Sequence, residues 1–414
     1  MVQKLFFVDK RENIYKSYED LYSDIKQSRS YNKYCFEHSY YEIFKRIVLS
    51  LILDKEIILL DSDFSIKKKK KLIEDSSLIE RSEEKIDLSN YSFDLERILK
   101  GTQLHNWRIT LFTSGTTGLP KRISHTFASI TRQVKKSGNH INDIWGFAYN
   151  PTHMAGLQVF FQALLNCNTI IRIFSYSREE IYTLIEEYGI TNISATPTFY
   201  RLLLPVEKSY GSVVRLTSGG EKFDARTQYN LLTAFPNAKL INVYASTEAG
   251  TLFAAKGDVF QIKQGMENLF KIVGSELYIH RDLVGFSDSI KLQGDWYPTG
   301  DLISVVSECP FTFKFISRKN EMINVGGYKV NPHEVEDMIR SYPGVSDVVV
   351  YAKRNSILGN IICCNIVSES VLLKEKDIRL YLSQRLQEFK IPRIIKFVDK
   401  LEVTRTGKIT RDRL

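Results

Sequence analysis

Residues Leu111–Thr126 read LFTSGTTGLPKRISHT, an apolar run that leads into a loop rich in glycine and hydroxyl side chains. A loop of this kind after a strand points successive backbone N–H groups into one concavity, which suits phosphate oxygens. Gly115 and Gly118 permit close approach of the backbone, and Lys121 adds a positive charge. Further hydroxyl donors are Thr113, Ser114, Thr116 and Thr117. By itself the stretch fits either a phosphate-binding loop or a plain surface turn.

The loop differs from the Walker A pattern, in which the last glycine directly precedes a lysine and then Ser or Thr. Here Pro120 precedes Lys121, and Arg122 follows it. The chemistry of the loop therefore depends on what accompanies it elsewhere in the chain.

Outward from this loop, short apolar strings alternate with segments of helical periodicity, which predicts parallel sheets covered by helices. The predicted strands cover 56–60, 108–112, 169–174, 192–195 and 239–244. The predicted helices cover 40–53, 154–166, 178–188 and 225–235.

The pattern changes after about Gly265, where shorter, turn-punctuated runs predict a small antiparallel or barrel-like unit. Its candidate strands are 276–280 and 302–306. The last segment predicts a compact α+β unit. Its predicted helices are 332–342 and 378–389, and its predicted strands are 346–351, 361–367 and 394–398.

Composition predicts a globular protein, since 43% of the residues are hydrophobic and 12% aromatic. Five cysteines without C-x-x-C spacing argue against a disulfide framework or zinc site. No apolar run approaches a membrane span, so we expect a soluble, cytoplasmic protein. The net charge of +9 favours anionic partners. Lys67–Lys71 fits a solvated helix face or loop better than a nucleic-acid patch, so no nucleic-acid partner is expected.

Four further stretches accompany the opening loop. They are NVYASTEAG at 242–250, DWYPTGDL at 295–302, ISRKNEMINVGGYKVNPHEVE at 316–336 and the terminal VTRTGKITRDRL at 403–414. The first resembles a strand that runs into a turn with a carboxylate, and the second a tight Pro/Gly turn that ends in an acid. In this order and with the opening loop, they resemble the motifs of the adenylate-forming superfamily, which includes acyl-CoA ligases, nonribosomal peptide adenylation domains and luciferases.

The resemblance implies two half-reactions. A carboxylate attacks the α-phosphate of ATP to give an acyl-adenylate and pyrophosphate, and a thiol then takes the acyl group and releases AMP. Because an anion must attack a polyanion, positioning and charge neutralisation supply most of the catalysis. The resemblance makes Lys408 the mobile cation that bridges the carboxylate and the α-phosphate.

The resemblance also distributes the ATP contacts. Thr247 bonds the α-phosphate and Glu248 holds Mg²⁺, a cation that prefers oxygen ligands. Asp301 accepts from the ribose hydroxyls, assisted by Arg318, and Tyr244 stacks on adenine. The β- and γ-phosphate clamp comprises Thr113, Ser114, Gly115, Thr116, Thr117, Gly118 and Lys121. The other edge of adenine lies along Gly219, Gly220 and Glu221.

In the family a small C-terminal domain rotates between the half-reactions. Carried over, this predicts an N-terminal adenylation domain at 1–318, shortened at its start, and a mobile C-terminal domain at 319–414. Asn320 stands at the hinge, where Asp or Lys is usual, and Gly326–Gly327 form the face that serves thiol transfer. The expected fold class is thus α/β plus α+β, with the large domain of helix-covered sheets carrying the barrel-like unit.

The acid substrate is predicted from AYNPTHMAGL at 148–157. Amino-acid-activating relatives place an Asp here, whereas this chain has His153 and no acid between Asp143 and Glu179. An α-amino acid is therefore disfavoured, and an aryl or acyl acid is expected, with aryl preferred. His153 is a pocket residue in this interpretation, although it also fits a core histidine.

The thiol is expected to be CoA or the phosphopantetheine of a separate acyl carrier protein, because the chain stops six residues after Lys408. Two other functions stay open at this point. One is an adenylate-only or luciferase-like enzyme, and the other is a non-catalytic nucleotide-binding protein of the same fold.

Overall fold

A computed structural model describes residues 4–61, 83–89, 104–112, 120–220, 223–355, 358–370 and 372–402, with Ile409 and Arg411. Several predicted site residues lie outside these ranges. They are Thr113, Ser114, Gly115, Thr116, Thr117, Gly118, Glu221 and Lys408, and the lysine run at 67–71 is outside as well.

The largest sheet has eight strands in the order β14-β13-β12-β11-β9-β10-β1-β2. Its interior pairs are parallel, and only the edge strands β2 and β14 pair antiparallel. The bounds are β1 Leu5–Asp9, β2 Ile14–Ser17, β9 Ile144–Phe147, β10 Thr169–Arg172, β11 Asn192–Ala195, β12 Arg215–Gly219, β13 Lys239–Ser246 and β14 Gly250–Ala255. The predicted parallel sheet is confirmed, and the carboxyl ends of its strands face one edge where ligands bind in open α/β sheets.

A second sheet, in the order β4-β5-β7-β8, carries the strands on both sides of the opening loop. Its bounds are β4 Tyr34–Cys35, β5 Ile57–Leu59, β7 Ile109–Phe112 and β8 Arg122–His125. β7 and β8 are antiparallel neighbours, so the chain reverses direction between them. A short pair, β3 Ser30–Asn32 with β6 Glu83–Lys85, lies apart from it.

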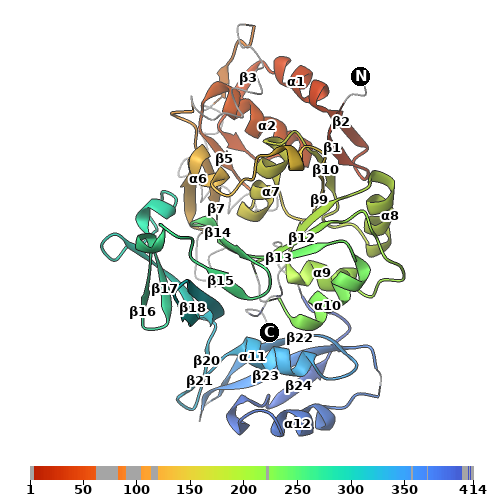
Figure 1. Cartoon of the computed structure of the whole chain (residues 1–414), viewed down its shortest axis with the longest axis vertical. Coiled ribbons are helices and arrows are strands. Elements are labelled where there is room, and N and C mark those ends of the chain that lie inside the picture. Colours follow the sequence, from red (N-terminus) through yellow and green to blue (C-terminus); the bar gives the residue numbers. More distant parts are fainter. Residues whose placement is uncertain are drawn as a thin grey trace.

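Helices cover these sheets (Figure 1). Their bounds are α1 Tyr18–Lys26, α2 Tyr40–Leu53, α6 Phe127–Thr131, α7 Met154–Leu164, α8 Arg178–Tyr188, α9 Pro197–Leu203 and α10 Ala225–Ala234. Local signals explain the ends of α8, where Ser177 forms a capping box with Glu180 and Gly189 adopts a left-handed φ of 61°. The helices predicted at 40–53 and 178–188 have the predicted bounds.

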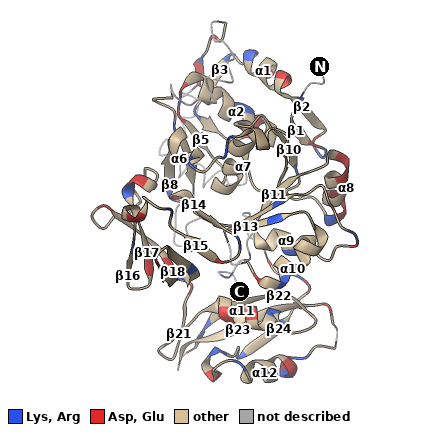
Figure 2. Ribbon diagram, viewed as in Figure 1, with Lys and Arg blue, Asp and Glu red and all other residues tan. Residues whose placement is uncertain are grey.

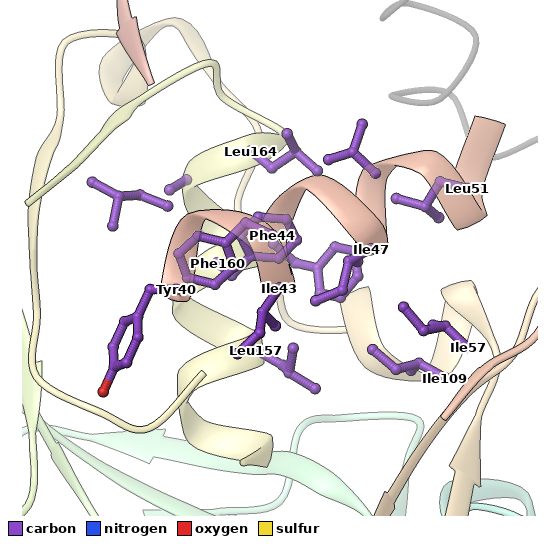
Figure 3. Packing of buried hydrophobic residues seen from close by; sticks show 14 of the residues in the cluster. Tyr40, Ile43, Phe44, Ile47, Leu51, Ile57, Ile109, Leu157, Phe160 and Leu164 are labelled. Atoms are coloured by element: carbon purple, nitrogen blue, oxygen red, sulfur yellow. The ribbon is translucent and has the colours of Figure 1, made fainter. Parts of the chain in front are cut away.

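The main core lies between α2 and α7 (Figure 3). Phe44 and Phe160 stack with ring centroids 4.5 Å apart, and Ile47 and Leu51 continue the same buried face of α2. This packing fixes α7 over the large sheet.

A five-stranded antiparallel sheet follows, in the order β15-β19-β18-β17-β16. Its bounds are β15 Val259–Gln261, β16 Phe270–Val273, β17 Glu276–His280, β18 Trp296–Glu308 and β19 Phe311–Arg318. The expectation of a tight turn at 295–302 is wrong, because β18 runs through it. Pro298 is tolerated opposite Tyr278 beside a register shift, and Gly300 absorbs a positive φ of 73°.

The C-terminal segment forms its own small core around β22, β23, α11 and α12. The bounds are β20 Ile323–Val325, β21 Tyr328–Val330, α11 Pro332–Arg340, β22 Val345–Asn355, β23 Gly359–Ser368, α12 Glu375–Ser383 and β24 Ile394–Phe397. α12 begins and ends earlier than the predicted 378–389, and a separate 3₁₀ turn spans Glu388–Lys390. The expected α+β character is confirmed.

Charged residues of both signs occur on both parts of the molecule (Figure 2). Within the described ranges, no helix is long and apolar enough to cross a membrane.

Candidate active site

A cleft of about 2230 Å³ lies where the large sheet, the antiparallel sheet and the C-terminal segment meet. The large sheet contributes Gly219 and Thr247, the antiparallel sheet ends at Arg318, and the C-terminal segment adds Asn320 and Ile409. Residues from the two sheets and from the C-terminal segment therefore line the same cleft. The predicted site residues among the lining are Lys121, His153, Gly219, Gly220, Thr247, Glu248 and Arg318.

The turn after β13 presents Thr247 and Glu248 to the cleft. Its backbone is held from two other segments. His125 Nε2 lies 2.8 Å from the Thr247 carbonyl oxygen, and the Gly285 amide donates to the Glu248 carbonyl oxygen at 2.7 Å. The turn is thus fixed without using either functional side chain.

His125 is fully buried at the end of β8, and burial lowers its pKa to about 4. The neutral ring donates from Nε2 to the Thr247 carbonyl, so Nδ1 accepts from the Ser129 hydroxyl at 3.0 Å. Gly285 packs directly on this ring, since a Cβ there would lie 2.7 Å from His125 Cε1. His125 therefore links β8, the strand that follows the opening loop, to the turn that carries Thr247.

Asp301 and Arg318 are paired across β18 and β19. Asp301 is 3% exposed, its Oδ2 accepts from the Tyr244 hydroxyl, and its Oδ1 lies 3.0 Å from Arg318 Nε. Burial raises the pKa of Asp301, while Arg318 and Tyr244 oppose the rise. Oδ1 receives no hydrogen bond of good geometry from the described residues. It keeps acceptor capacity of the kind that ribose hydroxyls require.

Tyr244 lies beside this pair rather than on the cleft wall. Its half-buried ring neighbours Phe253, Phe260 and Phe315, with centroids 5.7, 6.2 and 6.5 Å away. The hydroxyl contact with Asp301 is established here, and the stacking on adenine stays a prediction.

Gly219 and Gly220 end β12 at the same edge of the sheet. Gly220 has a φ of +84°, which favours glycine, and a Cβ on Gly219 would lie 3.1 Å from the Val243 carbonyl oxygen. The absence of a side chain on Gly219 lets β12 pack closely on β13, at a point where both glycines line the cleft.

His153 is the N-cap residue of α7, and its Nε2 lies 3.4 Å from Asp61 Oδ2. The Asp61 side chain is only 4% exposed and lines the cleft with His153. Sequence reasoning missed Asp61, although it directly follows the predicted strand 56–60, the position where ligand-facing residues occur in α/β sheets.

The end of the chain is clipped to α11. Arg411 Nη2 lies 2.7 Å from both carboxylate oxygens of Glu336, and Arg411 Nε donates to the Val350 carbonyl oxygen at 3.2 Å. Burial raises the pKa of Glu336. Hydrogen bonding to His333 and the charge of Arg411 outweigh burial, so the pKa is lowered to about 2. This clip fixes the segment three residues beyond Lys408.

The described residues contain no group of three or more His, Cys, Asp or Glu that could hold a metal. Glu248 is the carboxylate that the turn presents to the cleft. One carboxylate with phosphate oxygens fits the way Mg²⁺ binds nucleotides, because that ion rarely uses an all-protein cage.

Comparison with known proteins agrees with this geometry. The AMP-binding enzyme family matches residues 47–274, and the C-terminal domain of AMP-binding enzymes matches 334–408. The chain belongs to this family, and with it to the adenylate-forming superfamily.

Among its relatives is the 2-succinylbenzoate–CoA ligase of Staphylococcus aureus (strain MSSA476), 27% identical over 361 residues that span 79% of this chain and 69% of the relative. Solved structures share the fold. ATP-bound MatB of Rhodopseudomonas palustris is 16% identical with a TM-score of 0.77, covering 98% of this chain and 94% of that one. The o-succinylbenzoate CoA synthetase of Bacillus subtilis with ATP and magnesium is 18% identical with a TM-score of 0.73, covering 100% and 96%.

Proposed function

We propose that this protein is an AMP-forming acid–CoA ligase. A carboxylate oxygen of the substrate bonds to the α-phosphorus of ATP while the bond to pyrophosphate breaks. The CoA sulfur then bonds to the acyl carbon, its proton leaves, and AMP departs. The observation that carries the proposal is the convergence of Thr247, Glu248 and Arg318 on one cleft, with Asp301 paired to Arg318.

The first step brings an anion to a polyanion, so the site has to neutralise charge. Glu248 binds Mg²⁺, which supplies neutralisation at the phosphates when bound. Thr247 donates to the α-phosphate from a turn that is already fixed by His125 and Gly285. Lys408 brings the remaining positive charge, and the loop at 113–121 clamps the outer phosphates.

We assign binding of the adenosine part of ATP to two groups of residues, one on β18 and β19 and one at the end of β12. Asp301 accepts from the ribose hydroxyls through Oδ1, the atom that lacks a good hydrogen bond. Burial raises the pKa of Asp301, and the positive charge of Arg318 opposes this rise. Gly219, Gly220 and Glu221 border adenine, and Tyr244 stacks on it.

The contacts between residues 1–318 and 319–414 are consistent with two domains that move relative to each other. Arg226 on α10 donates to the Val345 and Arg340 carbonyl oxygens at 2.8 and 3.3 Å, and Arg201 on α9 lies 3.0 Å from Asp347. Polar groups of this kind can bond to water once they are separated, which suits an interface that opens. Asn320 is the proposed pivot.

For the acid, we propose an aryl carboxylic acid. His153 stands where amino-acid-activating relatives have an acid, and the relatives named 2-succinylbenzoate–CoA ligase act on an aryl acid. The same names support CoA as the thiol over a carrier protein, for which no specific observation speaks.

Pyrophosphate exchange tests the proposal. Exchange is measured with ATP, Mg²⁺ and a panel of aryl acids including 2-succinylbenzoate, fatty acids and amino acids. We expect exchange with aryl acids, none with amino acids, and AMP release with thioester formation only after CoA is added. Exchange with no acid would leave a non-catalytic nucleotide-binding protein, and adenylate without thioester would leave an adenylate-only enzyme.

A further inference from the structure

The cleft extends from the Thr247 turn into a channel beneath α7. Side chains on a strand alternate between faces, and all four odd positions of β13 line the channel: Lys239, Ile241, Val243 and Ala245. The opposite wall includes Met154, Gln158 and Gln162, whose spacing of four places them on one side of α7. The channel therefore runs the whole length of β13.

The channel stays open because α7 rests on the sheet at both sides of it. On the β9 side, Gly156 packs so closely that a Cβ would lie 3.1 Å from Phe147 Cζ. On the β14 side, Thr251 donates to Gln158 Oε1 at 2.7 Å. The strands between these supports keep Ile241 and Val243 half-exposed, although β13 is an interior strand.

The far end of the channel is cationic. Arg215 on β12 is the direct register partner of Lys239 on β13, and neighbouring strands lie only about 4.8 Å apart. Asp143 lies beside Arg215, with its carboxylate 3.5 Å from the guanidinium, and it also pairs with His140 at 2.9 Å. Within the described ranges Lys239 has no ion-pair partner.

Like charges at adjacent register positions repel each other, and an anion between them removes the repulsion. We propose that the acid substrate carries a second anionic group at its distal end and that Arg215 and Lys239 bind it. The inference rests on the proposed function. Ala245 lies six positions beyond Lys239, roughly 20 Å of strand, so the substrate is an aryl acid with an extended substituent that ends in the second anionic group.

Matched acids test the inference. Pyrophosphate exchange is compared for para-(9-carboxynonyl)benzoic acid and para-decylbenzoic acid, and for terephthalic acid as a short diacid. The expected result is a KM for the long diacid at least about tenfold below the KM of both others, with the KM for ATP unchanged. An equal or higher KM for the long diacid overturns the inference but leaves adenylation itself intact.

Charge variants assign the residues. Lys239 is exposed, so Lys239→Gln is expected to fold normally, which the melting temperature checks. It raises the KM for the long diacid about tenfold and leaves the KM for para-decylbenzoic acid within about twofold. Lys239→Glu shifts the preference toward para-(9-aminononyl)benzoic acid. If Lys239→Glu and Arg215→Gln select among the acids as the native protein does, the assignment of these two residues is overturned. If the native protein shows no exchange with any acid, the proposed function itself is wrong.

Discussion

At the residue scale, His125 supports the active site without facing the substrate. Its ring is buried and neutral, and it fixes the carbonyl of Thr247, the residue that contacts the α-phosphate in our account. A misplacement of about 1 Å in such a turn costs on the order of a hundredfold in rate.

We therefore predict that His125→Ala lowers kcat for adenylation by tenfold to a hundredfold, on the order of 1.4–2.7 kcal/mol. His125→Gln keeps a donor and recovers part of the loss. Ser129→Ala removes only the partner of Nδ1 and is the matched control, with a smaller effect. Steady-state assays of adenylation at saturating ATP measure kcat for the three variants. Equal kcat in His125→Ala and wild type would contradict the role.

The same residue predicts a pH dependence of stability. Its pKa is about 4 in the folded protein and 6.5 ordinarily, so the unfolded chain binds the proton more readily. The contribution of neutral His125 is fully present above about pH 6.5 and is lost as the pH falls from there toward 4. Urea unfolding of wild type and His125→Gln at several pH values checks this. The expected sign is a steeper acid loss of unfolding free energy in wild type.

Asp301 supplies a second prediction at this scale. Asp301→Asn preserves size but loses the charge that Arg318 and the ribose hydroxyls use, so the KM for ATP rises about tenfold or more. Tyr244→Phe removes only the hydroxyl donor to Asp301 and has a smaller effect. Isothermal titration with ATP provides an independent measurement. A larger loss in Tyr244→Phe than in Asp301→Asn would contradict the assignment.

At the scale of elements, the Arg411–Glu336 clip joins the end of the chain to α11. If Lys408 acts in adenylation, releasing the clip impairs that step alone. We predict that Arg411→Gln slows adenylation several-fold while thioester formation from synthetic acyl-adenylate proceeds at the wild-type rate. Rapid-quench measurement of each half-reaction separates the two. Equal loss in both steps would indicate a general loss of structure in the C-terminal unit.

Elements are also where the sequence was most informative. The parallel strands and amphipathic helices follow from periodicity, and α2 and α8 have the predicted bounds. The strand through 295–302 was not predicted because Pro and Gly usually mark turns, and only pairing with β17 and β19 overrides that preference. Asp61 and His125 were missed because their partners lie 92 and 122 residues away. Such contacts are set by topology rather than by local spacing.

At the scale of the whole molecule, function depends on how the C-terminal unit meets the large sheet. Arg226 is exposed on α10 yet donates to two carbonyls of the C-terminal unit. Arg226→Ala weakens this arrangement, so adenylation slows while the thioester step is unchanged or faster. Lys208→Ala, which removes a surface pair with Glu186 away from the interface, is the control with no change. A uniform effect of Arg226→Ala on both steps would contradict a role in domain arrangement.

The central claim is that one chain runs two half-reactions and that Lys408 serves only the first. The most direct measurement compares wild type and Lys408→Ala in both steps, as acid-dependent pyrophosphate exchange and as thioester formation from synthetic acyl-adenylate with CoA. We expect Lys408→Ala to lower the exchange rate by a hundredfold or more, about 2.7 kcal/mol, and to keep thioester formation. Undiminished exchange in Lys408→Ala would contradict it.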